Sequence, residues 1–175
     1  MDSSVYAYEI TDKSIILRDD KGNTFSLLMD SETVKSYLGE PKELIMSKDS
    51  DGDISGYVYD GIEFYVDNFL KNQREKYLVW TILVENPNYL ITFKNFRINE
   101  TRFQDVSSFF NVSNGQIYSK YSPDELNLLC WFSAEQYMPP DTEDVQKYGD
   151  FIIVLTFDSK TQILKKCQLS IDYGI

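Results

Sequence analysis

Three aspartates alternate in the stretch SKDSDGDISG, at Asp49, Asp51 and Asp53. Alternate acids open a calcium-binding loop, which also needs a glycine at its sixth position and a glutamate at its twelfth. Counted from Asp49, these two positions hold Ile54 and Asp60, and the sequence that follows is typical of a strand. The stretch therefore predicts a solvated turn and not a metal site.

Other residues able to carry catalytic or metal chemistry are scarce or badly placed. The chain has no histidine, which removes the commonest general base and the commonest metal ligand. Its two cysteines, Cys130 and Cys167, lie in apolar alternating stretches, which are typical of buried and inert thiols. The neighbouring acids that could act as a catalytic pair lie in polar stretches, where they would stay ionised: Asp124 and Glu125, and Asp141, Glu143 and Asp144. We therefore expect no enzyme activity, no cofactor and no metal.

Aromatic residues are the most prominent feature that is left, with 13 Tyr, 11 Phe and 2 Trp. Tyrosine and tryptophan on an exposed sheet make good anchors for a protein partner. Five of them alternate along expected strands and are our candidate partner-binding residues: Tyr57, Tyr59, Tyr65, Trp80 and Trp131. The alternative is that these side chains mainly pack the core.

The net charge of −11 argues against some partners. Nucleic acids and anionic membrane surfaces need cationic groups, so neither is an expected partner. No stretch approaches the roughly 18 consecutive apolar residues of a spanning helix, and MDSSVYAYEI lacks the features of a signal peptide. As written, the chain could be cytoplasmic, or it could be an exported domain without its signal.

Two short helices are expected. Asp30 or Ser31 can cap ETVKSYL, in which apolar residues recur on one face. Thr101 and Gln104 can form a capping box before DVSSFF.

Strands fill most of the rest. GYVYDGIEFYV predicts a hairpin turning at Asp60-Gly61. YLVWTILVE predicts a buried strand that turns through NPN into YLITFKNFRI, and FIIVLTF and ILKKCQLSI flank the polar turn DSKT as a second hairpin. SPDE could begin a helix, but alternation after it favours a strand from about Leu126. Residues 1–30 predict two or three strands with a turn at 20–23.

The two halves of the chain resemble each other at an offset of 72 residues. SKDSDGDI at Ser47 matches SKYSPDEL at Ser119, and Val34 matches Val106. We therefore predict one compact α+β unit with N-terminal β-strands (1–30), repeat 1 (31–100) and repeat 2 (101–175). Each repeat is expected to be a helix followed by antiparallel strands, giving a continuous or paired antiparallel sheet with helices on one face, plus an N-terminal β-hairpin.

A helix ending in LGEP, then a turn, then GYVYDGIEFYV resembles the small envelope modules of the SmpA type. The tandem arrangement from Ser31 to Ile171 resembles the β-lactamase-inhibitor-protein fold. The resemblance implies a binding protein without catalysis, with a concave sheet that presents aromatic side chains to a protein partner. The chain departs from these families in having Asn111-Val112 where repeat 1 has Gly-x-Pro, and no lipid-attachment cysteine. Cys130 and Cys167 are expected on strands separated by another strand, too far apart for a disulfide.

The sequence thus predicts a protein-binding module that uses an aromatic sheet face. The alternative is an acidic immunity or inhibitor protein that neutralises a basic toxin or enzyme. A third class, an enzyme or small-ligand carrier, would need a deep pocket lined by converging polar groups.

Overall fold

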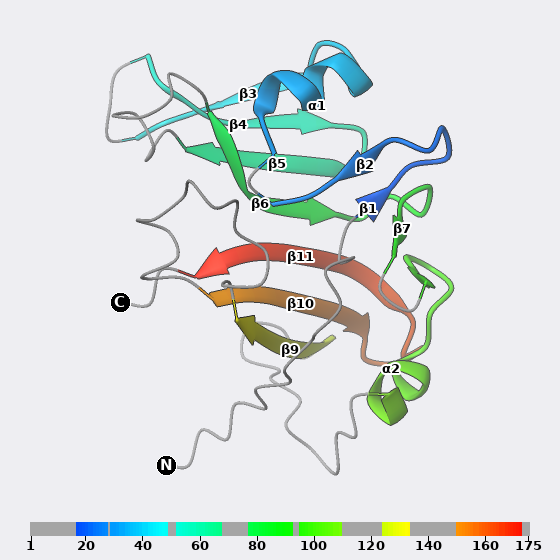
Figure 1. Cartoon of the computed structure of the whole chain (residues 1–175). Helices are drawn as coiled ribbons and strands as arrows, with labels where there is room; N and C mark the ends of the chain where they lie inside the picture. The colour runs from blue at the N-terminus through cyan, green and yellow to red at the C-terminus, as the bar shows by residue number, and fades with distance from the viewer. Residues whose placement is uncertain are drawn as a thin grey trace.

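A computed structural model describes residues 17–27, 29–48, 52–67, 77–92, 95–109, 124–133 and 150–172. These residues form eleven strands and two short helices (Figure 1). The strands are β1 (Leu17–Arg18), β2 (Thr24–Phe25), β3 (Glu43–Met46), β4 (Ile54–Tyr59), β5 (Ile62–Asp67), β6 (Leu78–Val84), β7 (Leu90–Ile91), β8 (Phe96–Arg97), β9 (Glu125–Ser133), β10 (Asp150–Asp158) and β11 (Leu164–Asp172). The helices are α1 (Ser31–Leu38) and α2 (Phe103–Phe109).

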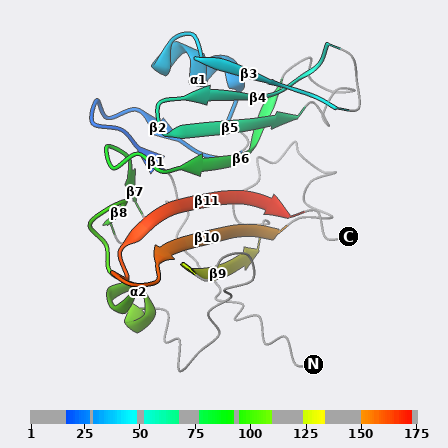
Figure 2. The same cartoon turned by 180° about the vertical axis from the view of Figure 1, so that it is seen from behind.

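Seven of the strands form one antiparallel sheet in the order β3-β4-β5-β6-β11-β10-β9 (Figures 1 and 2). The two halves of the chain meet where β6 pairs with β11, with Val84 opposite Cys167 and Thr81 opposite Ser170. The expected antiparallel sheet is confirmed, and it runs without a break through both halves. We call it the large sheet.

The predicted hairpins form because their turns suit their backbone. In β4–β5, Gly61 adopts a φ of 67°, a conformation that costs glycine little. In β10–β11, the Asp158 carboxylate accepts hydrogen bonds from the backbone N–H groups of Lys160 and Thr161 and from the Thr161 hydroxyl. The stretch after SPDE is strand β9, as its alternation predicted.

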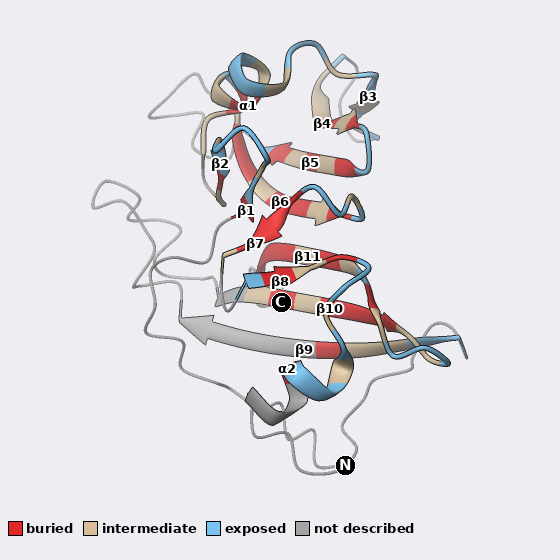
Figure 3. Ribbon diagram, turned by 90° about the vertical axis from the view of Figure 1, so that its right-hand side faces the viewer, coloured by how far each residue is buried: buried red, intermediate tan, exposed pale blue. Residues whose placement is uncertain are grey.

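The remaining four strands form a small sheet in the order β2-β1-β7-β8. The expected N-terminal hairpin is present in it as β1 and β2, closed at Asp19, whose carboxylate accepts hydrogen bonds from Lys21 and Asn23. Phe25 of β2 is fully buried, and its ring contacts Phe64 of β5 at a centroid distance of 5.5 Å. The small sheet is therefore packed on one face of the large sheet, which we call the core face (Figure 3).

Alternation decides which side chains form the core. Along β5, Ile62, Phe64 and Val66 are buried while Glu63 and Tyr65 between them are half-buried, because successive residues of a strand point to opposite faces. The same alternation in β11 buries Cys167 and Leu169 while Gln168 stays half-buried.

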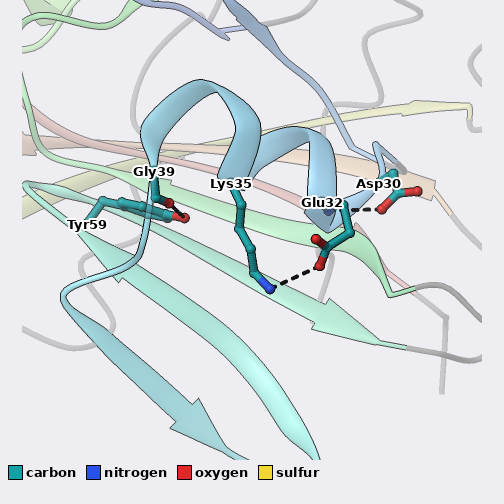
Figure 4. Close-up of polar contacts among 5 residues, drawn as sticks. All are labelled: Asp30, Glu32, Lys35, Gly39 and Tyr59. Carbon is teal, nitrogen blue, oxygen red and sulfur yellow. Dashed lines mark hydrogen bonds and ion pairs between the residues drawn. The ribbon is translucent and has the colours of Figure 1, made fainter.

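The helix α1 begins at a predicted cap. The Asp30 carboxylate accepts a hydrogen bond of 2.9 Å from the backbone N–H of Glu32, as a helix N-cap does (Figure 4). The helix ends at Gly39, whose φ of 80° favours glycine, and the Tyr59 hydroxyl of β4 donates a hydrogen bond to the Gly39 carbonyl. One end of α1 is thus fixed by its own sequence and the other by the large sheet.

Replacing Asp30 by alanine is expected to lower the free energy of unfolding by about 1 kcal/mol, because the first turn of α1 loses its acceptor. Urea denaturation of the wild-type and variant proteins measures the loss. Glu40→Ala is the matched control, since it removes the same charge at the other end of the helix, where an acid gives no cap. Equal losses in the two variants would show that Asp30 does not act as the cap.

The predicted fold class is wrong. The described residues are mostly strand, with helices of only 8 and 7 residues. The helices do not form a layer over one face of two helix-then-strand repeats. The small sheet packs on the core face through Phe25, and α2 lies at the end of the β10–β11 hairpin, where the Phe103 backbone N–H donates a hydrogen bond to the Gln162 carbonyl. The core face of the large sheet is therefore covered by a second sheet and not by the predicted layer of helices.

Segments that match at the 72-residue offset also occupy different positions in the two sheets. The offset relates β4 to β9 and β6 to β10. However, β5 lies between β4 and β6, whereas β9 and β10 pair directly. The same offset relates the short strand β8 of the small sheet to residues 168–169 of β11 in the large sheet. The similarity reflects shared patterning of helix caps and strands, not two equivalent units.

The prediction about the cysteines holds. Cys130 of β9 is paired with Ile153 of β10, and Cys167 of β11 is paired with Leu155 of β10. One strand therefore separates the two cysteines, which places their Cα atoms beyond the reach of a disulfide.

Candidate protein-binding surface

The face of the large sheet opposite the core face carries the candidate surface, which we call the open face. α1 and the small sheet pack against the other side, and Figure 2 turns the open face toward the viewer. Half-buried side chains line it, and those that matter below are Val58, Glu63, Tyr65, Trp80, Leu83, Ile152, Val154, Lys166 and Gln168.

Tyr65 and Trp80 form the aromatic centre of this face. The register irregularity between Tyr65 and Val66 brings Trp80 of β6 beside Tyr65 of β5. Their ring centroids are 6.4 Å apart and the rings meet edge to face at 69°. This arrangement is favourable for aromatic pairs. Both rings stay half-buried, so each keeps surface to offer a partner.

The phenol of Tyr65 is held by a neighbouring carboxylate. Its hydroxyl donates a hydrogen bond of 2.8 Å to Glu63, two residues earlier on the same strand and face. Burial, and then this hydrogen bond to the carboxylate, raise the pKa of Tyr65 to about 12. The tyrosine is therefore neutral near pH 7, and its ring orientation is fixed before any partner arrives.

Polar side chains continue the open face toward β11 and β10. The Thr81 hydroxyl lies 3.3 Å from that of Ser170, and the Gln168 side-chain amide donates a hydrogen bond of 2.8 Å to Ser170. Lys166 forms a 3.0 Å ion pair with Glu85 at the edge of this region. Thr81 and Ser170 are each only 7% exposed, so Gln168 and Lys166 are the half-buried polar side chains that this part of the open face offers to a partner.

The structure divides the five predicted binding residues. Tyr57 and Tyr59 are 1% and 8% exposed and belong to the core face. The ammonium of Lys35 lies 5.0 Å from the centroid of the Tyr57 ring. These two tyrosines pack the core and present no contact surface, which is the alternative that the sequence left open for them. Tyr65 and Trp80, in contrast, lie together on the open face.

Trp131 can be placed by its backbone register. It is paired with Ile152, which is paired with Ser170, and that residue is paired with Thr81. Thr81 in turn is paired with Tyr65, so Tyr65 and Trp131 occupy the same cross-strand row. Four strand spacings of about 4.8 Å separate the two positions, or about 19 Å along the row.

Sequence reasoning missed the contributions of Glu63 and Leu83 to this surface. The signal was present, because Glu63 and Tyr65 share one parity in IEFYVD while the apolar Ile62, Phe64 and Val66 share the other. Because Glu63 is acidic, it indicates which set of alternate residues in the strand faces away from the core.

Of the three alternating aspartates, Asp53 lies within the described residues. Asp49 and Asp51 lie outside the described residues, as do Asp141, Glu143 and Asp144. Within the described ranges, no three His, Cys, Asp or Glu side chains gather into a group that could hold a metal ion.

The helices among the described residues are too short or too polar to cross a membrane.

Alkaline pH is expected to destabilise the protein through three tyrosines. Burial is the main cause that raises the pKa of each of Tyr59, Tyr65 and Tyr89 to about 12. A raised folded-state pKa contributes stability that is complete below the unfolded value of about 10 and is lost as the pH rises toward 12.

This pH dependence is measurable as the free energy of unfolding at a series of alkaline pH values, with phenolate absorbance recorded in parallel. Tyr65→Phe, which cannot ionise at that position, should flatten part of the decline. A free energy of unfolding that does not fall in this window would contradict the protected environment of these phenols.

Comparison of the chain with protein-family models, with curated proteins and with solved structures finds no match. The comparisons therefore do not test the resemblance to SmpA-type modules and to the β-lactamase-inhibitor-protein fold, and this resemblance stays a prediction.

Proposed function

We propose that the chain is a protein-binding module without catalytic activity and that the open face is its contact surface. The observation that carries this proposal is the Tyr65–Trp80 pair, which lies half-buried on the face opposite the core. Tryptophan and tyrosine are the side chains most enriched among residues that dominate binding energies.

The surroundings of the pair support this role. Leu83 and Val58 are both paired with Glu63 and add half-buried aliphatic surface in the row beside Tyr65, and Glu63 already satisfies the Tyr65 hydroxyl. A partner therefore does not have to supply an acceptor for that hydroxyl. Because the rings lie on strands and not on loops, little side-chain freedom is lost on binding. The partner best suited to this surface offers an apolar centre surrounded by hydrogen-bonding groups.

An affinity capture from lysate of the cells that make the protein tests the proposal. We expect the wild-type chain to retain a specific protein and the Tyr65→Ala/Trp80→Ala variant to lose it. Tyr37→Ala is the control, because Tyr37 is 38% exposed but lies on α1, away from the open face. Equal retention by the double variant, or loss on Tyr37→Ala alone, would contradict the proposed surface.

The net charge of −11 favours a second candidate, an immunity or inhibitor protein that neutralises a basic toxin or enzyme. Association of an acidic with a basic protein weakens as salt screens the charges. The affinity for the captured partner is therefore expected to fall with rising ionic strength. An affinity that salt does not change would exclude this candidate and leave the first one standing.

A further inference from the structure

The strand β3 ends the large sheet, and no strand of the described ranges pairs with its outer side. Large hydrophobic side chains that are exposed in these ranges are Tyr37, Leu44 and Met46, and the last two belong to β3. Leu44 is 44% exposed and Met46 is 49% exposed. An edge strand with exposed apolar side chains is a ready template for another strand.

The usual devices against edge pairing are weak here. Proteins protect such edges with prolines, lysines, inward charges and bulges. Pro41 and Lys42 stand before β3, and Glu43 is the single charge within it. The register irregularity of this hairpin skips Ser55 in β4, so β3 itself stays regular.

We propose that the outer side of β3 pairs with β3 of a second copy of this chain, in antiparallel orientation about a two-fold axis. The large sheet would then run without interruption through a dimer. The register that matches best places Ile45 opposite Ile45 of the second copy. Leu44 then lies opposite Met46 of the second copy, and Met46 lies opposite Leu44.

Self-complementarity of the strand favours a second copy over another occupant. A two-fold contact uses the same patch on both molecules, so each apolar residue must find its match within one short segment. In the stated register every apolar position of β3 meets an apolar position, and Glu43 meets Ser47 of the second copy.

Charge does not prevent this pairing locally. The register brings Lys42 near Lys48 of the second copy at each end of the contact. Lys42, however, forms a 3.0 Å ion pair with Asp60 of its own copy, which compensates its charge. The large net charge of the chain instead predicts that the dimer strengthens as salt screens repulsion between the copies.

The helices leave room for the contact. α1 lies over β4, where Lys35 covers Tyr57, and it does not cover the exposed Leu44 of β3. Two β4 strands would be separated by three strand spacings, or about 14 Å. Two helices of about 10 Å diameter fit side by side at that separation and would flank the paired Leu44 and Met46 side chains.

Sedimentation velocity across a wide concentration range tests the proposal. The wild-type chain of 20.4 kDa is expected to sediment as a dimer, and Leu44→Lys/Met46→Lys is expected to sediment as a monomer. Tyr37→Lys is the matched control and should stay dimeric, because the Tyr37 ring contacts Phe25 of the small sheet and so lies on the side of α1 that faces away from β3. A wild-type monomer at every concentration, or a double variant that stays dimeric, would overturn the proposal.

Oxidative cross-linking tests the register itself. Ile45→Cys is expected to form a disulfide-linked dimer, because the two substituted positions face each other across the axis. Glu43→Cys should not, because it lies opposite Ser47 of the second copy, and the unmodified chain gives the baseline from its native cysteines. Equal cross-linking of both variants would reject this register and with it the paired edge.

This dimer is independent of the proposed function. The Tyr65→Ala/Trp80→Ala variant should remain dimeric, and Leu44→Lys/Met46→Lys should still bind a partner through the open face. The failure of either proposal therefore leaves the other to be judged by its own measurement.

Discussion

Replacing Phe64 by alanine is expected to lower the free energy of unfolding by about 3–5 kcal/mol, the usual range for a buried phenylalanine. Phe64 is fully buried, and its ring contacts Phe25 of the small sheet at 5.5 Å and Tyr59 of β4 at 6.0 Å. Its removal would leave a cavity between the two sheets, where neither backbone can easily move inward. Such a loss is a large share of the stability of an ordinary domain.

Tyr65→Ala is the matched control, because it deletes the next side chain, which lies on the opposite face of the same strand. Only a half-buried ring and one hydrogen bond are lost there, so we expect about 1 kcal/mol. Urea denaturation of the two variants under one set of conditions gives the comparison. A Tyr65→Ala variant that is the less stable of the two would reverse our assignment of the core and open faces.

The second large effect is expected in binding. Trp80→Ala should weaken the affinity for the partner by about 2 kcal/mol or more, or about 30-fold in Kd, if Trp80 is a central anchor. Tyr65→Ala should weaken binding as well. Because the two rings are in contact, the double variant should lose less than the sum of the two single losses.

Titration calorimetry with the captured partner measures these affinities. Trp80→Phe should restore part of the lost affinity, because it keeps an aromatic ring at this position. Tyr37→Ala should change the affinity by no more than about 0.5 kcal/mol, as expected for a surface position away from the interface. A Trp80→Ala variant that binds like wild type would contradict the role of this ring.

Local structure could be predicted from the sequence wherever a short segment decides its own conformation. The cap at Asp30, the turn at Asp60-Gly61 and the hairpin turn at Asp158 each depend on residues within a few positions of one another. The strand character of residues 125–133 followed from alternation, which arises because successive side chains of a strand point to opposite faces of a sheet and one face packs on the core.

The arrangement of these elements could not be predicted from local patterns. The small sheet is built from two-residue strands, which are too short to show any alternation. Its pairing of β1 with β7 joins residues more than 70 positions apart. Similar caps and strands in the two halves suggested a repeat, but sheet order depends on these long-range pairings, which no local similarity encodes.

The sequence also could not say which tyrosines would face a partner. In β4 both parities of ISGYVY are apolar or small, so Tyr57 and Tyr59 could not be assigned to a face. The structure assigns them to the core face, because Lys35 of α1 contacts Tyr57 and Phe25 contacts Phe64 on that face. In β5 the presence of Glu63 made the choice possible.

A site-specific photo-cross-linker tests most directly whether the open face is the contact surface. An unnatural photoreactive residue is placed at Leu83, on the open face, or at Thr24, an exposed residue of the small sheet on the other side of the molecule. The partner is then cross-linked in the cells that make the protein. We expect a covalent adduct with the partner from Leu83 and none from Thr24. An adduct from Thr24 alone, or no adduct from Leu83, would contradict the open face as the binding surface.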